Sequence, residues 1–98
     1  MIIRIVKMTF DEAMVKEFED VFHNSKEKIR AFEGCAHLQL LKDINTPNIY
    51  FTYSYWENED ALNAYRHSPL FETVWAATKK LFIAKPEAWS VEQEVVLD

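Results

Sequence analysis

The chain contains very little glycine, cysteine and histidine, and each shortage argues against a class of site. Its only glycine in 98 residues is Gly34, so a glycine-rich loop that cradles phosphates cannot be built from it. Its only cysteine is Cys35, which excludes an intrachain disulfide and a cysteine metal cluster. The three histidines, His23, His37 and His67, show no metal-ligand spacing on any one predicted element. We therefore expect neither a metal nor a bound cofactor.

The charge and hydropathy of the chain limit its partners. Lys and Arg number 11 against 16 Asp and Glu, a net charge of −5, and no basic stripe is present. Neither a nucleic acid nor an anionic membrane surface is therefore an expected partner. No run approaches the roughly 20 apolar residues of a membrane span, and the N-terminal segment lacks the apolar run of a signal peptide. The expectation is one cytoplasmic domain that spans residues 1–98.

Aromatic residues, in contrast, are abundant. They make up 14% of the chain and gather between Tyr50 and Trp75. This stretch predicts an aromatic strand that ends at Trp56, followed by a helix broken at Ser68 and Pro69. So much aromatic surface in a short chain needs a core, a partner or a flat ligand to cover it.

Hydrophobic periodicity predicts four strands and two helical regions. Thr9 or Asp11 can cap the first helix, and Gly34 can end it in a left-handed conformation. The second helical region is interrupted at Pro69, which suits the first turn of a new helix, and Pro86 marks its exit. The strands are expected at residues 2–9, 35–42, 49–56 and 89–95, and the helical regions between 9 and 32 and between 58 and 82.

The resulting order, β-α-β-β-α-β, is the ferredoxin-like α+β pattern: a four-stranded antiparallel sheet with the helices on one face. The helices can cover only one face of the sheet, yet several strands are apolar or aromatic on both. In the third strand, Tyr53 and Tyr55 face away from Trp56. We therefore expect the open sheet face to pack against a second copy of the chain as a homodimer, with these two tyrosines in the interface.

Three segments carry a resemblance to a known family. They are FEGC at residues 32–35, YWENEDAL at 55–62 and SPLF at 68–71. Together with the element order, they resemble the antibiotic biosynthesis monooxygenase family, in which the second segment reads Trp-Glu-Ser-x-Glu-Ala-Leu and the third Ser-Pro-His-Phe. The resemblance implies a dimeric α+β barrel. The activities of the family include cofactor-free quinol or anthrone oxygenation and haem degradation, and many members have no known reaction.

The chain departs from this family at positions that affect its chemistry. Family members often carry histidine where Tyr65 and Leu70 stand here. Haem-degrading members combine an asparagine on the first strand, a tryptophan after the third strand and a histidine on the helix that follows. Trp56 matches the second of these, but Arg4 and Trp75 stand near the other two. The resemblance therefore makes this chain a poor candidate for haem degradation.

Five residues form the candidate substrate-binding set: Trp56, Tyr65, His67, Arg4 and Trp75. Trp56 is expected to point toward the helices, either as the wall of a pocket or as a core tryptophan whose indole N–H finds a carbonyl. Tyr65 and Trp75 are expected to face the core, and the Tyr65 phenol can hydrogen-bond a substrate oxygen. Arg4 offers a further polar contact. His67 is either a general base or a solvated loop residue.

The other polar residues have simpler explanations. Cys35 and His37 are expected on one face of the second strand, but strand neighbours two positions apart are too distant for an easy hydrogen bond, so a catalytic pair is not favoured. Glu57, Glu59 and Asp60 stand at a helix start, where capping and the helix dipole explain them. No catalytic residue is assigned.

These observations leave two functions open. The resemblance implies a cofactor-independent monooxygenase that acts with O2 on a small quinol, anthrone or phenol in a pocket between sheet and helices. The alternative is a non-catalytic dimer, which either binds a small apolar or aromatic ligand or has a filled core and a purely structural role.

Overall fold

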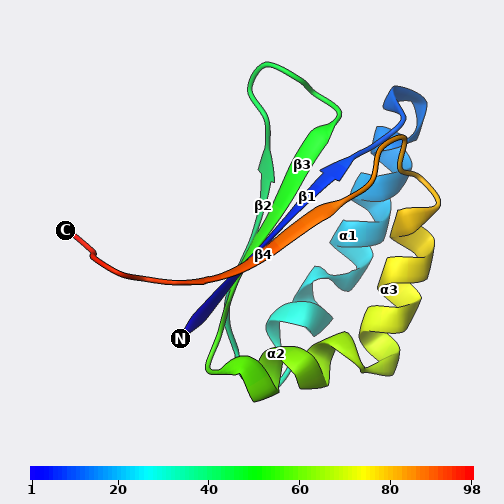
Figure 1. Cartoon of the computed structure of the whole chain (residues 1–98). Helices are drawn as coiled ribbons and strands as arrows, with labels where there is room; N and C mark the ends of the chain where they lie inside the picture. The colour runs from blue at the N-terminus through cyan, green and yellow to red at the C-terminus, as the bar shows by residue number, and fades with distance from the viewer.

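The computed structural model describes residues 1–98 and has the predicted ferredoxin-like fold, with the second helical region divided in two. The antiparallel strands lie in the order β2-β3-β1-β4, and all three α-helices lie on one side of the sheet (Figure 1). The strands are β1 (Ile2–Thr9), β2 (Cys35–Lys42), β3 (Ile49–Trp56) and β4 (Glu87–Glu92). The helices are a short 3-10 turn, η1 (Glu12–Met14), then α1 (Val15–Arg30), α2 (Glu59–Arg66) and α3 (Pro69–Lys79). None of these helices has the length and apolar character needed to cross a membrane.

Side-chain caps decide where the helices begin. The Asp11 carboxylate accepts a hydrogen bond from a backbone N–H two residues later and opens η1. Thr9 lies within β1, so of the two predicted caps only Asp11 acts. Asn58 caps α2 and Ser68 caps α3, and each side-chain oxygen accepts from the backbone N–H three residues later. With its own cap at Ser68 and Pro69 in its first turn, α3 is a helix separate from α2.

The single glycine is placed where both conformation and space require it. The helix α1 ends at Arg30, slightly earlier than predicted, because the N–H of Phe32 bonds to a carbonyl three residues back instead of four. Gly34 follows with a φ of 90°, which side-chain-bearing residues rarely adopt. A Cβ added at Gly34 would collide with the Cβ of Ala61 on α2. The glycine thus allows α2 to lie directly against the turn that follows α1.

Gly34→Ala is therefore expected to lower the free energy of unfolding by about 2 kcal/mol, through the collision and the strained φ together. The measurement is urea denaturation of both proteins. Adding Ala61→Gly removes the collision but not the strain, so the double variant should recover only part of the loss. A Gly34→Ala protein as stable as the parent would contradict this explanation.

The strand register assigns side chains to the two sheet faces. Arg4 pairs with Ser54 and Val6 with Thr52, and these side chains face the helices together with Trp56. The alternate positions face the open side: Ile5 pairs with Tyr53 on one side and with Trp89 on the other. This register confirms the prediction that Tyr53 and Tyr55 point away from Trp56.

A β-bulge corrects one prediction about β2. The pairing with β3 shifts by one residue between Cys35 and His37, so Cys35 lies opposite Trp56 while His37 lies opposite Tyr55. Cys35 is buried beside Trp56, and burial raises the pKa of its thiol. The His37 ring instead packs against Tyr55 on the open face, with ring centroids 4.9 Å apart. The expectation that Cys35 and His37 share a face was wrong, and the two side chains cannot act as a pair.

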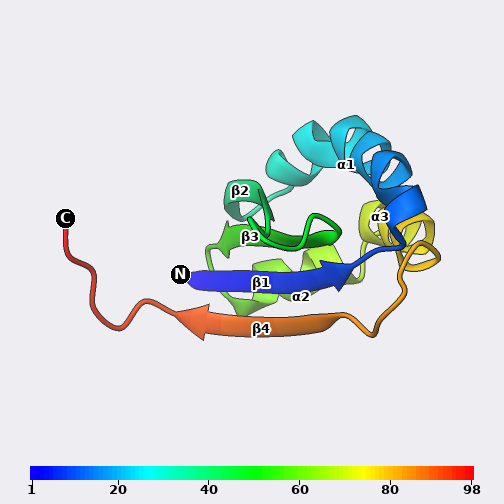
Figure 2. The ribbon, with the colours of Figure 1, turned by 90° about the horizontal axis from the view of Figure 1, so that it is seen from above.

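The last strand, β4, begins two residues earlier and ends three residues earlier than predicted. Ile2 pairs with Glu92, and because β1 begins at Ile2 it offers no backbone partner beyond that pair. The segment after Glu92 runs away from the body of the molecule (Figure 2), and Val95 is 76% exposed. The predicted continuation of the strand to Val95 was therefore wrong.

The buried core consists of two separate clusters. The larger joins β1, α1 and β3 to the segment after α3, and the smaller joins β2, β3 and α2. The larger contains Met8, Phe10, Phe18, Phe22, Tyr50 and Leu81, and the smaller contains Cys35, Trp56 and Leu62. Residues of both clusters line the same cavity, so the cavity lies between the two clusters.

Candidate functional site

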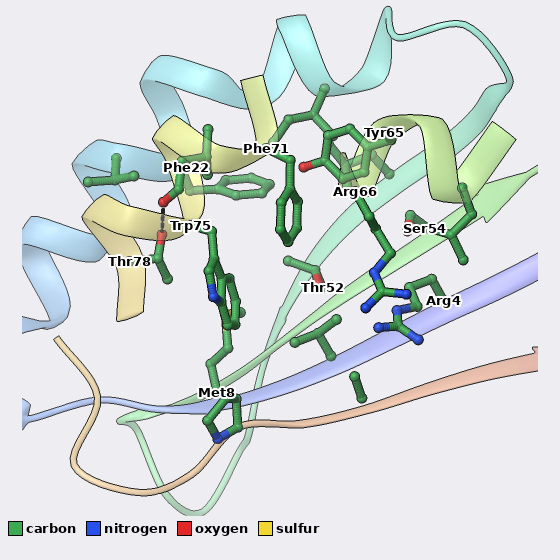
Figure 3. A pocket seen from close by; sticks show the side chains of 18 of the residues that line it. Arg4, Met8, Phe22, Thr52, Ser54, Tyr65, Arg66, Phe71, Trp75 and Thr78 are labelled. Carbon is green, nitrogen blue, oxygen red and sulfur yellow. Dashed lines mark hydrogen bonds between the residues drawn. The ribbon is translucent and has the colours of Figure 1, made fainter. Parts of the chain in front are cut away.

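A cavity of about 350 Å³ lies between the helix-covered face of the sheet and the helices (Figure 3). Fourteen of its twenty lining residues are hydrophobic, and the size is at the low end for small-molecule sites. The aromatic lining residues are Phe18, Phe22, Trp56, Tyr65, Phe71 and Trp75. The polar ones are Arg4, Thr52, Ser54, Arg66 and Thr78, and the aromatic Tyr65 adds a phenol hydroxyl. Flat rings and a few polar groups are the lining that a small aromatic ligand requires.

Trp56 combines the two roles that the sequence left open. It is only 1% exposed and belongs to the smaller core cluster, yet it also lines the cavity. Its indole N–H donates a hydrogen bond of 3.0 Å to the Ser54 hydroxyl, rather than to the expected carbonyl. The Tyr65 ring stacks on it with centroids 4.9 Å apart. Trp56 is therefore a rigid wall whose orientation is set by the strand and by its hydrogen bond.

Tyr65 is the neutral polar group of the aromatic wall. Its ring lies between Trp56 and Phe71, and its hydroxyl makes no hydrogen bond within the chain. Burial, with a smaller contribution from Cys35, raises the pKa of Tyr65 to about 12. The phenol therefore stays protonated at neutral pH and can donate to a ligand oxygen, but it cannot act as a base.

The helix α3 supplies the facing aromatic wall. Phe71 and Trp75 stack with centroids 5.8 Å apart and an angle of 11° between their planes. One helical turn separates them, so both side chains lie on the same side of α3. Trp75, which was expected to face the core, lines the cavity in the view of Figure 3.

The polar end of the cavity contains two arginines. Arg4 reaches in from β1, and its guanidinium donates to the Ser90 hydroxyl over 3.0 Å. Arg66 reaches across from the last residue of α2, and Figure 3 shows the two guanidinium groups close together. Burial and the neighbouring Arg66 lower the pKa of Arg4, although it stays charged. Sequence reasoning missed Arg66, although its spacing of four residues from Leu62 places both on one side of α2.

His67 is not brought into the cavity. It is exposed at the end of α2, and its Nδ1 lies 2.8 Å from the carbonyl oxygen of Asn63. Of the predicted set, the structure therefore brings together Arg4, Trp56, Tyr65 and Trp75 and leaves His67 outside. No carboxylate or histidine lines the cavity, and no group of three His, Cys, Asp or Glu side chains is placed to hold a metal ion.

Solved structures share this fold over almost the whole chain. A conserved protein from Methanosarcina mazei is 20% identical with a TM-score of 0.89, and the match covers 95% of this chain and 93% of that one. A variant of SnoaB, described as a cofactor-independent oxygenase from Streptomyces nogalater, is 22% identical with a TM-score of 0.87, covering 98% and 95%. Rv0793 from Mycobacterium tuberculosis is 13% identical with a TM-score of 0.89, covering 99% and 98%. At these identities the likeness establishes the fold alone.

The sequence itself establishes the family. No curated protein matches the chain. The sequence model of the family described as antibiotic biosynthesis monooxygenase matches residues 1–77, which include three of the four strands and the two arginines of the cavity. The chain belongs to the antibiotic biosynthesis monooxygenase family.

Proposed function

We propose that this protein is a cofactor-independent monooxygenase that acts on a small quinol, anthrone or other phenol inside the cavity. The observation that carries the proposal is the cavity itself, with aromatic walls on two sides and positive charge at one end. Membership of the family supports it, and so does the likeness to SnoaB, described as a cofactor-independent oxygenase. A purely structural role with a filled core has less support, because about 350 Å³ is empty.

In the proposed reaction, the substrate supplies the electrons. A hydroquinone that has lost a proton transfers one electron to O2, and the radical and superoxide combine to form a carbon-bound hydroperoxide. Loss of water then leaves a hydroxyquinone. One oxygen atom of O2 enters the product and the other leaves as water. The protein has to bind the ring, keep water away and stabilise the negative charge.

Residues of the cavity can do each of these tasks. Phe71 and Trp75, which are partly exposed and line the cavity, provide surfaces for a flat ring, and the apolar lining excludes water. The positive charge of Arg4 and Arg66 favours the ionised phenol, and the Tyr65 hydroxyl can donate to its oxygen. Because the cavity holds no carboxylate or histidine, the substrate loses its proton to bulk water before it enters the cavity and not to a protein base.

The pH dependence of the rate follows from this absence of a base. We expect kcat/KM to rise with pH through the phenol pKa of each substrate and to shift when a substrate with another pKa is used. Tyr65 should cause no fall at alkaline pH until its own pKa of about 12 is approached. A rise at one fixed pH for all substrates would indicate a titrating protein group and contradict the assignment.

Tyr65→Phe tests the hydrogen bond to the substrate oxygen. We expect kcat/KM to fall by about tenfold, the effect of losing one hydrogen bond to a charged group. The melting temperature should be nearly unchanged, because the hydroxyl has no partner within the chain. Steady-state oxygen consumption and thermal melts of both proteins measure this. An unchanged kcat/KM would remove Tyr65 from the mechanism.

The proposal as a whole is tested by oxygen uptake of the purified, metal-stripped protein with hydroquinones, anthrones and haem. We expect uptake with a quinol or anthrone and none with haem. With labelled O2, one labelled atom should appear in the organic product. Binding of a quinol or anthrone without uptake would favour the second candidate, a non-catalytic ligand-binding protein, which the absence of a base in the cavity also favours.

We also propose that two copies of the chain pair through their open sheet faces, since proteins of this family typically form dimers. The support on this face is a group of half-buried rings, His37, Tyr53 and Tyr55, next to Ile5. Beside them on β4, Trp89 is 44% exposed and Val91 is 40% exposed. An apolar face of this kind resembles the core of a protein interface.

A further inference from the structure

The two arginines of the cavity lack a negative partner. The ion pairs of the chain join Lys7 to Glu87 and Lys16 to Asp20, and neither involves Arg4 or Arg66. No Asp or Glu lines the cavity, although the chain as a whole carries a charge of −5. Two like charges therefore converge at one end of an otherwise apolar space. An anion at that point would relieve their repulsion, which adds to the effect of burial in lowering the pKa of Arg4.

The donors that remain free suit a small planar anion. Arg4 uses one guanidinium nitrogen on Ser90, and the Arg66 guanidinium makes no hydrogen bond or ion pair within the chain, so most of their side-chain N–H groups are available. A guanidinium fork matches the two oxygens of a carboxylate. The backbone N–H groups of a phosphate-binding loop are absent here, because the neighbouring strand backbones are paired and the only glycine, Gly34, lies elsewhere.

We propose that Arg4 and Arg66 bind the carboxylate of an aromatic acid whose ring lies against the aromatic walls of the cavity. This inference rests on the proposed function in that it specifies the substrate class for the same cavity. The carboxylate neutralises one of the two positive charges and leaves the other to favour an ionised phenol. The substrate class is accordingly the hydroxylated aromatic carboxylic acids.

Binding of two matched analogues, one negatively charged and one neutral, tests the site without requiring turnover. Naphthoate and its neutral isostere naphthamide are titrated calorimetrically into the wild-type protein and into Arg4→Gln, Arg66→Gln and Lys28→Gln. Lys28 is exposed on α1 and outside the cavity, so Lys28→Gln controls for the loss of one positive charge. We expect naphthoate to bind the wild type and Lys28→Gln at least about tenfold more tightly than it binds either arginine variant. Naphthamide should bind all four proteins equally weakly.

Equal affinity of naphthoate and naphthamide for the wild type, or full naphthoate affinity in both arginine variants, would overturn the proposal. Tighter binding of naphthyl phosphate than of naphthoate would overturn the choice of a carboxylate. Folding of the variants is checked by thermal melts, in which naphthoate should raise the melting temperature of the wild type and not that of Arg66→Gln.

Failure of this inference can be told apart from failure of the proposed function. A protein that oxygenates neutral quinols but does not prefer naphthoate would retain the proposed function and lose the carboxylate site. A protein that binds naphthoate through the arginines but consumes no oxygen with any phenol would show the reverse.

Discussion

Replacing Trp56 with alanine is expected to lower the free energy of unfolding by about 3–5 kcal/mol, the usual cost of removing a buried tryptophan. Trp56 is 1% exposed and packs against Cys35 and Leu62, so its loss would join a new void to the existing cavity. The Ser54 hydroxyl would also lose its indole donor. A loss of this size is a large part of the total stability of a small domain, roughly 5–15 kcal/mol. Urea denaturation at equilibrium measures it.

Trp56→Phe is the matched control, because it keeps a ring at the cavity wall and removes the indole N–H. We expect it to cost much less stability than Trp56→Ala and to keep measurable oxygenation, with weaker binding of the aromatic substrate. An alanine variant as stable as the wild type would show that Trp56 is not a core residue, and one with undiminished turnover would show that it is not a wall of the site.

The second large effect is expected on the sheet face away from the helices. Tyr53 lies on β3 at the middle of that face, between Ile5 on β1 and Gln39 on β2. Tyr53→Asp would bury an unpaired carboxylate in the proposed dimer interface, which costs several kcal/mol. We expect a change from dimer to monomer, measured by sedimentation velocity.

Asn24→Asp is the control for this experiment. It adds the same negative charge to the exposed surface of α1, on the helix side of the molecule, and should leave the dimer intact. A wild-type protein that sediments as a monomer, or a Tyr53→Asp protein that stays dimeric, would show that the open sheet face is not the interface. The exposed rings of that face would then need another partner.

The sequence was sufficient to predict the element order because its local signals agree with one another. Alternation in residues 49–56 distinguishes the face of Tyr53 from that of Trp56, and the register confirms this separation. The cap at Ser68 and the ring of Pro69 predict a new helix, and α3 begins there. Such signals depend on neighbours within a few positions, so they can be read before any tertiary contact is known.

Other features depend on contacts between distant segments. The bulge at Cys35 and His37 arises from the pairing with β3, and strict alternation along β2 gives the wrong face for His37. The end of β4 depends on where β1 begins. Arg66 was overlooked because an arginine at the end of an amphipathic helix ordinarily reaches solvent, and only the folded chain brings it to Arg4. Whether Trp56 borders empty space depends on the sum of all the packing around it.

Under the proposed function, the cavity between sheet and helices is the place where an aromatic substrate meets oxygen. Val74 lines the cavity from α3 and takes no part in the proposed chemistry, so Val74→Phe narrows the space without removing a functional group. Oxygen uptake by this variant, with a quinol or anthrone that the wild type oxidises, is the most direct measurement. We predict a folded protein with clearly slower uptake than the wild type, and a stability equal to or above that of the wild type. Undiminished uptake by folded Val74→Phe would place the reaction somewhere other than the cavity.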